Sequence, residues 1–359
     1  MAKLRERMGR PHARTRLGIA LAAASLFAAA CGGGSTGSSQ ASDIGPITVL
    51  CGATEEWCEA NTQAFTKATG IQASFVRLSS GEAAARLEAG KESPEFDVWH
   101  GGPADGYVAA AERGLLEPYV SPNAAAIRPE WKAPDGTWTG VYVGVLGFCS
   151  NKKILEQRGL SAPTSWQELL DPRFEKNISV AHPSTSGTGF TALWTQVTLA
   201  GGDQAKALEY MRSLRPNILQ FTRSGVGPIQ QVSRGEIATG IVFSHDCVKS
   251  KEEGITDLEV TFPKEGTGYE VGGVAVVKNA RNPEGAKRYV DWALTAEAQE
   301  LGPSAGSFQV PTNPNAKIDE RSAKISEISL VNYDIAAAGA ARSDLIKRFD
   351  EEIAKAPAS

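Results

Sequence analysis

Residues 178–193 of the chain read ISVAHPSTSGTGFTAL. The β-branched start predicts a buried strand, the small polar residues that follow predict a loop, and the apolar end predicts the first turn of a helix. Amide groups at the start of a helix have no partners within the helix and carry partial positive charge, so they favour a bound anion. Five residues of the loop supply such donors: Ser184, Thr185, Ser186, Gly187 and Thr188. We therefore expect this loop to hold a negatively charged ligand.

The N-terminal segment has the pattern of a secretory signal peptide, expected over residues 1–30. A basic stretch precedes an apolar run at residues 17–30, which is shorter than the ~20 residues that a membrane-spanning helix needs. The small residues before Cys31 resemble a bacterial lipoprotein cleavage site, which implies lipidation of Cys31. Residues 31–46 predict a flexible tether. The mature protein is therefore expected in the periplasm or on the extracellular face of the membrane, which it would contact through the lipid anchor only.

Removal of the signal leaves an acidic chain. Taking six basic residues and one acidic residue from the 37 Lys and Arg and the 41 Asp and Glu leaves 31 against 40, a formal charge of about −9. A net negative surface repels phosphate backbones, so nucleic acid is not expected as a partner. About 310 residues follow the tether, which is enough for two lobes with separate cores.

Four cysteines remain after Cys31: Cys51, Cys58, Cys149 and Cys247. In an oxidising compartment an even number of cysteines indicates two disulfides, with three possible connectivities. We expect Cys51 to pair with Cys58 and Cys149 with Cys247, and buried free thiols are the alternative. Because the sequence has no Cys-x-x-Cys spacing, neither a thiolate metal site nor a resident cofactor is expected.

Strands and helices alternate along the chain, which predicts an α/β fold. Strands are predicted at residues 47–50, 72–78 and 96–99, and each runs into a loop of small polar residues. Ligands of open parallel sheets bind at the carboxyl ends of the strands, so these loops predict a binding cleft. Their candidate ligand-binding residues are Thr54, Glu55, Ser79, Ser80, Gly81, Gly101 and Gly102.

Two apolar, glycine-rich strands are predicted at residues 141–148 and 271–277, and a second α/β stretch lies between them. Two crossings of the chain between lobes imply a hinge. The tail at residues 322–353 is predicted to be helical, but the sequence does not decide which lobe it covers. The expected organisation is a signal peptide at 1–30, a tether at 31–46, a first lobe at 47–149 and 271–359, and a second lobe at 150–270.

Several motifs resemble those of extracellular solute-binding proteins of ABC importers, most closely the ferric-type class. The motifs are PTSW at 163–166, LLDPRF at 169–174, HPSTSGT at 182–188 and EAQEL at 297–301, in addition to the signal cysteine. The resemblance covers residues 47 to about 320. It implies a two-lobed class II periplasmic-binding-protein fold with two crossover hinge strands. It also implies a monomer that closes around a small solute and delivers it to a permease and an ATPase.

The residues at the end of one second-lobe strand bear on the solute. Iron-binding members of the resembled class typically place two adjacent tyrosines there, and this chain has no Tyr-Tyr pair. It has His245 and Asp246 at that strand end and Glu270 downstream, which resembles the subgroup that binds sugar phosphates. Carboxylates and imidazole suit sugar hydroxyls and repel a bare phosphate. The phosphate is therefore expected at the helix-start loops and beside Arg223, whose guanidinium can bind it with two hydrogen bonds.

Two other functions stay open as alternatives to the capture of a small anionic solute. A ferric or other metal-ion binding protein could use histidines at strand ends, although no close His spacing typical of a metal site occurs. A secreted phosphate-ester hydrolase would need a nucleophile. Gly-x-Ser-x-Gly matches occur at 33–37 and 302–306, but neither has the strand and helix of a nucleophile elbow. We therefore expect a binding protein and not an enzyme.

Overall fold

A computed structural model describes residues 44–355 of the chain. In it the β-branched runs form strands, and the segments with apolar residues at helical spacing form helices. The expected signal peptide, Cys31 and the tether up to residue 43 lie outside the described residues. Among the helices of the described part, none is both long and apolar enough to cross a membrane.

The elements fall into two groups, which we call the first half and the second half. The first half contains β1 (Ile47–Cys51), α1 (Glu55–Thr69), β2 (Ala73–Arg77), α2 (Ser80–Ala89), β3 (Val98–Pro103), α3 (Ala104–Glu112), β4 (Leu116–Glu117), α9 (Pro283–Ala293), α10 (Ala296–Gln299) and β11 (Val310–Pro311). The second half contains α4 (Lys152–Gln157), β6 (Ile178–Ala181), α5 (Gly187–Leu199), α6 (Gln204–Leu214), β7 (Ile218–Thr222), α7 (Gly227–Ser233), β8 (Thr239–Phe243), α8 (Ser244–Glu252) and β9 (Leu258–Thr261). β5 (Thr139–Asn151) and β10 (Tyr269–Val277) connect the halves, and α11 (Ile335–Phe349) is followed by a π-helical turn at Asp350–Ala354.

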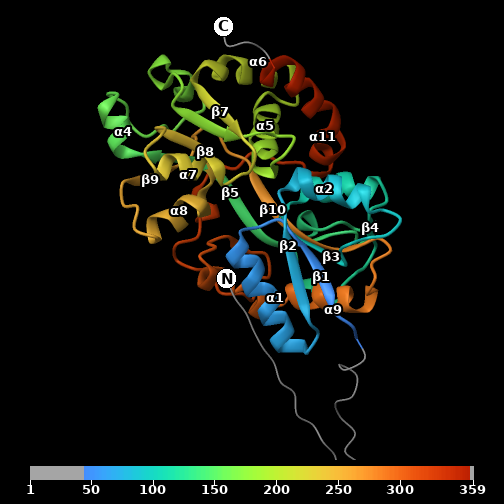
Figure 1. The fold of residues 1–359 in the computed structure, drawn as a ribbon. Coiled ribbons are helices and arrows are strands. Elements are labelled where there is room, and N and C mark those ends of the chain that lie inside the picture. Colours follow the sequence, from blue (N-terminus) through green and yellow to red (C-terminus); the bar gives the residue numbers. More distant parts are fainter. Residues whose placement is uncertain (1–43, 356–359) are drawn as a thin grey trace, which may run out of the picture. The chain divides into compact units, whose positions relative to one another are not determined.

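One sheet joins both halves in the order β2-β1-β3-β10-β5-β8-β6-β7. β1 is parallel to β2 and β3, and β6 is parallel to β7 and β8. β5 pairs antiparallel with β10 along its first part and with β8 along its second part. β5 and β10 are therefore the two crossover strands that the sequence predicts, and Figure 1 shows them between the two groups of strands.

Each half has its own hydrophobic core. In the first half, Val49 of β1, Phe65 of α1 and Tyr289 of α9 are buried in one cluster. In the second half, Phe190 of α5 and Ile241 of β8 are buried in another. Apolar residues at helical spacing on α1 and α9 explain the packing of the first half, because each helix turns one apolar face toward the sheet. α5 is buried at every position from Gly187 to Val197.

Both predicted disulfides are confirmed. Cys51 at the end of β1 bonds Cys58 in α1, and their Cα atoms are 6.0 Å apart. Cys149 of β5 bonds Cys247 of α8, with a Cα–Cα distance of 5.8 Å. The first bridge encloses the loop that follows β1, and the second ties a crossover strand to a helix of the second half.

The C-terminal tail has a short 3-10 helix at Ile325–Glu327 and is α-helical only from Ile335. The prediction of a helix over residues 322–353 is therefore wrong for most of residues 322–334. The segment before α11 instead pairs with Thr267. The Thr267 amide donates to Ser329 O at 2.9 Å, and the Val331 amide donates to Thr267 O at 2.9 Å. These bonds satisfy backbone groups that a helix would otherwise pair internally.

α11 contacts both halves. Phe349 of α11 is buried in the core of the second half. A Cβ atom on Gly339 would lie 2.5 Å from Val108 Cβ of α3, so the helix approaches the first half closely at this glycine. Arg342 pairs with the buried Asp105 of α3, and its guanidinium lies 4.2 Å from the ring centre of Phe190 of α5. The tail thus spans the joint between the halves.

Candidate ligand-binding site

A pocket lies where strands of both halves end. The loops after β1, β2 and β3 line it from the first half, the loops after β6, β7 and β8 line it from the second half, and the crossover strands add two side chains. Carboxyl ends of parallel strands meet at one edge of a sheet, which brings these distant loops together. The lining residues are Gly52, Ala53, Thr54, Arg77, Ser79, Ser80, Gly102, Pro103, Tyr142, Ser186, Gly187, Thr188, Gly225, Val226, Phe243, His245, Asp246, Glu270 and Gln309.

The structure brings most of the candidate residues of the sequence analysis to this pocket. Those that line it are Thr54, Ser79, Ser80, Gly102, Ser186, Gly187, Thr188, His245, Asp246 and Glu270. Those that lie outside its lining are Glu55, Gly81, Gly101, Ser184, Thr185 and Arg223. Contact of any of them with a ligand stays a prediction.

We call Ser80, Gly102, Ser186, Gly187 and Thr188 the donor end of the pocket. A Cβ atom on Gly187 would lie 2.8 Å from Ser80 Oγ, and one on Gly102 would lie 3.2 Å from the same oxygen. The starts of α2 and α5, which belong to different halves, therefore face each other closely. Both helix starts direct a positive dipole end at the space between them, which favours an anionic group there. One amide of α2, that of Gly81, is already paired with Thr185 O.

We call His245, Asp246 and Glu270 the acid end of the pocket. His245 and Asp246 begin α8 and are each 8% exposed, while Glu270 of β10 is 4% exposed. His245 Nε2 lies 3.8 Å from Asp246 Oδ1. A Cβ atom on Gly144 would lie 2.8 Å from Glu270 Oε1 and 2.9 Å from His245 Cε1, so this glycine of β5 leaves room for both side chains.

Burial sets the charge of the acid end. It raises the pKa of Glu270 well above the usual glutamate value, and the negative charges of Asp246 and Asp105 raise it further. Burial also raises the pKa of Asp246, against the opposing effects of His245, Lys249 and Arg77. It lowers the pKa of the His245 imidazole, which favours the neutral ring. Burial at the acid end therefore favours the uncharged forms of Glu270, Asp246 and His245.

The lining also includes residues that the sequence did not predict, among them Arg77 and Tyr142. The Arg77 Nε donates to Ala53 O at 3.1 Å, and the Gly102 amide donates to the Tyr142 hydroxyl at 2.9 Å. Both lie inside predicted strands, where the sequence does not tell which side chains point at the pocket. For Arg77 one signal was available: it is a charged residue near the end of a predicted strand, just before the loop that begins at Ser79.

The structure places Arg223 outside the pocket lining, and its contact with a ligand stays a prediction. Its side chain is 79% exposed, and its Nη2 lies 2.5 Å from Glu82 Oε1 of α2. The other oxygen of Glu82 accepts from the Ser79 hydroxyl at 2.9 Å. β7, which precedes Arg223, is the outermost strand of the second half. Gly225 and Val226 of the loop after β7 line the pocket, whereas Arg223 itself lies outside the lining.

Residues outside the lining instead connect the halves around the pocket. The Gly81 amide of α2 donates to Thr185 O in the loop before α5, at 3.0 Å. Lys249 of α8 lies 3.7 Å from Glu56 of α1. With the Arg223–Glu82 pair, these contacts hold the two halves together at the rim, and the donor end and the acid end lie inside.

The chain is similar to several known proteins. A match to the family described as bacterial extracellular solute-binding protein spans residues 94–338. The periplasmic binding protein AfuA from Actinobacillus pleuropneumoniae, solved with exogenous fructose-6-phosphate bound, is 39% identical and covers 87% of this chain and 99% of its own, with a TM-score of 0.84. The periplasmic binding protein P5PA is 35% identical over 86% of this chain and 99% of its own, with a TM-score of 0.81. A putative 2-aminoethylphosphonate-binding periplasmic protein of Salmonella typhimurium is 28% identical over 68% of this chain and 70% of its own length.

These similarities confirm the two-lobed periplasmic-binding-protein fold that the sequence motifs imply. Solute-binding proteins of ABC importers capture a small solute outside the cytoplasm and deliver it to a permease, and the relatives are binding proteins, not enzymes. The chain belongs to the bacterial extracellular solute-binding proteins.

Proposed function

We propose that this protein captures a small phosphorylated polyol, with a sugar phosphate as the best candidate, and delivers it to the permease of an ABC importer. The observation that carries the proposal is the pairing of two chemically different ends within one pocket. The donor end suits a phosphate and the acid end suits sugar hydroxyls. A solute that satisfies both ends needs an anionic group and a hydroxylated body.

The donor end supports binding of the anionic group. Neutral donors at the starts of α2 and α5 surround it, and the hydroxyls of Ser80 and Thr188 lie beside those amides. Each helix start contributes about 0.3–1 kcal/mol to the binding of an anion, and more where the site is partly buried. AfuA, which shares 39% of its residues with this chain, was solved with fructose-6-phosphate, and this similarity supports the same class of solute here.

The acid end supports binding of the hydroxylated body. Carboxyl and imidazole groups accept and donate hydrogen bonds to neighbouring hydroxyls. A protonated Glu270 can donate as well as accept, whereas an ionised one only accepts. Carboxyl groups suit hydroxyls better than a phosphate, so the proposed orientation of the solute has the phosphate at the donor end and the ring at the acid end.

Binding couples to closure because the two halves share the solute. The donor end takes Ser80 and Gly102 from the first half and Ser186 to Thr188 from the second, so a phosphate there contacts both. A ligand that shifts an open form from 99% to 1% of the population needs about 5.5 kcal/mol of differential affinity. The permease then meets a closed, loaded protein.

Isothermal titration calorimetry of the mature chain tests the function. We expect tight, one-to-one binding of fructose-6-phosphate or another hexose phosphate, and weak binding of fructose, inorganic phosphate and ferric citrate.

Asp246→Ala should reduce discrimination among sugar isomers, with the exposed Glu92→Ala as a matched control. Tight binding of ferric citrate alone would favour the metal-ion alternative, and release of free phosphate with turnover would favour the hydrolase.

We also propose that residues 1–30 are removed, that Cys31 carries the lipid anchor, and that the mature chain is a monomer with lobes at 47–149 with 271–359 and at 150–270. The basic and apolar pattern of the N-terminus supports the first two points. Mass spectrometry of the membrane-extracted protein measures the anchor. An unlipidated chain that begins upstream of Cys31 would contradict this part of the proposal.

A further inference from the structure

We propose that Arg77 is the residue by which the pocket distinguishes a phosphorylated solute from its neutral counterpart, and that the Cys51–Cys58 disulfide positions it. This inference rests on the proposed function, and it names a specificity-determining residue that the sequence motifs do not contain. Arg77 is the last residue of β2 and lines the pocket from the first half. Among the described lining residues, it is the one with a permanent positive charge.

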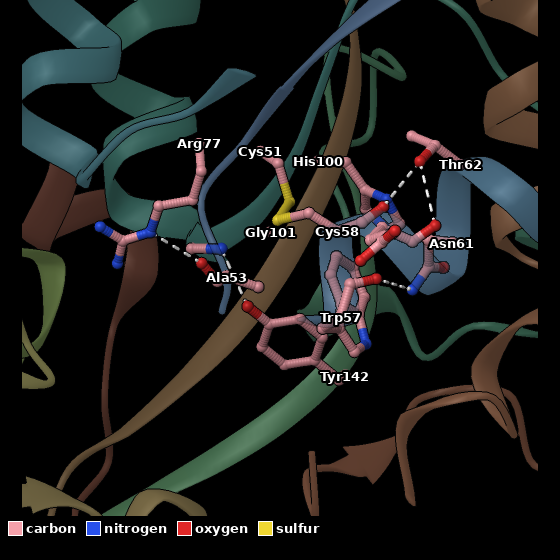
Figure 2. The surroundings of a disulfide bond; sticks show 12 residues. Cys51, Ala53, Trp57, Cys58, Asn61, Thr62, Arg77, His100, Gly101 and Tyr142 are labelled. Atoms are coloured by element: carbon pink, nitrogen blue, oxygen red, sulfur yellow. Dashed lines mark hydrogen bonds between the residues drawn. A yellow bond between two sulfur atoms is a disulfide. The ribbon is translucent and has the colours of Figure 1, made fainter. Parts of the chain in front are cut away.

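The guanidinium of Arg77 is anchored at one point and open elsewhere. Its Nε donates to Ala53 O at 3.1 Å, and Figure 2 shows both Nη atoms directed away from that carbonyl. Within residues 44–355, neither Nη atom has a hydrogen bond or an ion pair with another side chain. A guanidinium that is fixed through Nε presents its two Nη groups as a fork, and this fork matches two oxygens of a phosphate.

Arg77 is not neutralised by the carboxyl groups across the pocket. Its positive charge lowers the pKa of Asp246, but burial outweighs this effect and the pKa of Asp246 is raised overall. No ion pair forms between the two side chains in the described structure. The positive charge of Arg77 therefore has no ion-pair partner among the described side chains, and a dianionic solute benefits from this charge more than a neutral one.

The disulfide fixes the carbonyl that anchors Arg77. Cys51 and Arg77 are direct partners in the pairing of β1 with β2. Residues 52–54 lie inside the loop that the Cys51–Cys58 bond closes, so this loop includes Ala53. A Cβ atom on Gly52 would overlap the backbone of Gly101, which leaves the loop little room to shift. Figure 2 shows Ala53 between the Arg77 guanidinium and the Cys51–Cys58 disulfide.

The test compares Arg77→Ala and Arg77→Lys with the wild-type protein, with fructose-6-phosphate and fructose as the two titrants. Arg77→Ala should weaken fructose-6-phosphate binding about 10- to 100-fold, the effect of removing a charged hydrogen-bond partner, with little change for fructose. Lysine should restore part of the affinity, because it keeps the charge and loses the fork. Arg86→Ala, an exposed arginine on α2 paired with Glu95, is the matched control and should change neither titration.

A double-mutant cycle tests the role of the disulfide. Replacing both Cys51 and Cys58 with serine should weaken fructose-6-phosphate binding in the wild type, but should add little to Arg77→Ala, since both changes remove the same interaction. Thermal unfolding of each empty variant verifies that it folds. Independent, additive losses would overturn the positioning role of the disulfide.

The outcomes separate this inference from the proposed function. An Arg77→Ala protein that binds fructose-6-phosphate as tightly as the wild type, or that loses equal affinity for fructose, overturns the role of Arg77 and leaves the proposed function intact. A wild-type protein that binds no phosphorylated polyol overturns both.

Discussion

The donor end and the acid end of the pocket differ in how the chain builds them. The donor end consists of backbone amides and small side chains at two helix starts, and glycines there allow α2 and α5 to approach. The acid end consists of ionisable side chains that are almost fully buried. An end made of backbone depends on the relative position of the two halves, whereas an end made of side chains depends on protonation. The two ends should therefore respond to different perturbations.

The largest effect is expected from a change that keeps the halves apart at the donor end. In Gly187→Val the new side chain would overlap Pro103 and Ser80, because even a Cβ atom would lie 2.5 Å from Pro103 Cδ. Overpacking of this kind costs about 1–3 kcal/mol, so hexose phosphate affinity should fall up to about 100-fold. Calorimetry measures the loss. Gly45→Val is the control, because Gly45 is exposed, has no positive φ, and a Cβ atom there would come no closer than 3.8 Å to another atom. Unchanged affinity would mean that the halves need not approach here.

An intermediate effect is expected from pH, and it should depend on Glu270. Its pKa in the folded, empty protein is raised by burial and by nearby negative charge. Because the pKa of Glu270 is raised on folding, the contribution of this group to the free energy of unfolding is complete below its pKa in the unfolded chain, near 4.5. The contribution is lost as pH rises through the pKa in the folded protein. The melting temperature of the empty wild type should therefore fall more steeply above pH 4.5 than that of Glu270→Gln. Parallel curves for the two proteins would show that Glu270 does not titrate in this way.

The opposite slope is expected from His100, which lies outside the pocket lining. Burial lowers the pKa of His100 to about 3. Its contribution to stability is present above pH 6.5 and declines as pH falls from 6.5 toward 3. Asp246 has a raised pKa and follows the direction of Glu270. A comparison of Glu270→Gln with the wild type isolates the carboxyl effect, since His100 is the same in both proteins.

The smallest effect is expected at the rim. Arg223→Ala removes an ion pair in which the arginine side chain is 79% exposed, and exposed pairs contribute about 0.2–1 kcal/mol. Affinity should fall less than about fivefold, equally for every solute, and less still in high salt. A selective loss for phosphorylated solutes would return Arg223 to the anion site that the sequence suggested.

The sequence predicts the fold well where a residue's role is local. The strand, loop and helix of residues 178–193 and the two crossover strands follow from β-branched runs and glycine, and the structure confirms them. The donor-rich loops also follow, because small polar residues directly after a strand mark the sheet edge where ligands bind.

The sequence predicts the site less well where position depends on strand order. Arg223 was expected in the site because a guanidinium can bind a phosphate with two hydrogen bonds, but only the sheet order shows that the strand before it, β7, is an outer strand. Arg77 was missed because its side chain could face either side of β2. The segment at 322–334 was predicted to be helical from its local pattern. Its extended part pairs with Thr267, which is far away in the sequence, and a local pattern does not show such a partner.

The contact of α11 with both halves has a consequence for how this protein can be used. A rotation of the halves cannot leave the end of the chain undisturbed, since Gly339 rests on α3 while Phe349 is held in the other core. A fluorophore attached at the exposed Asp334, just before this helix, would change its surroundings whenever the solute arrives. The protein can thus serve as an optical sensor in which α11 transmits the movement of the halves to the dye, and the dye need not touch the pocket.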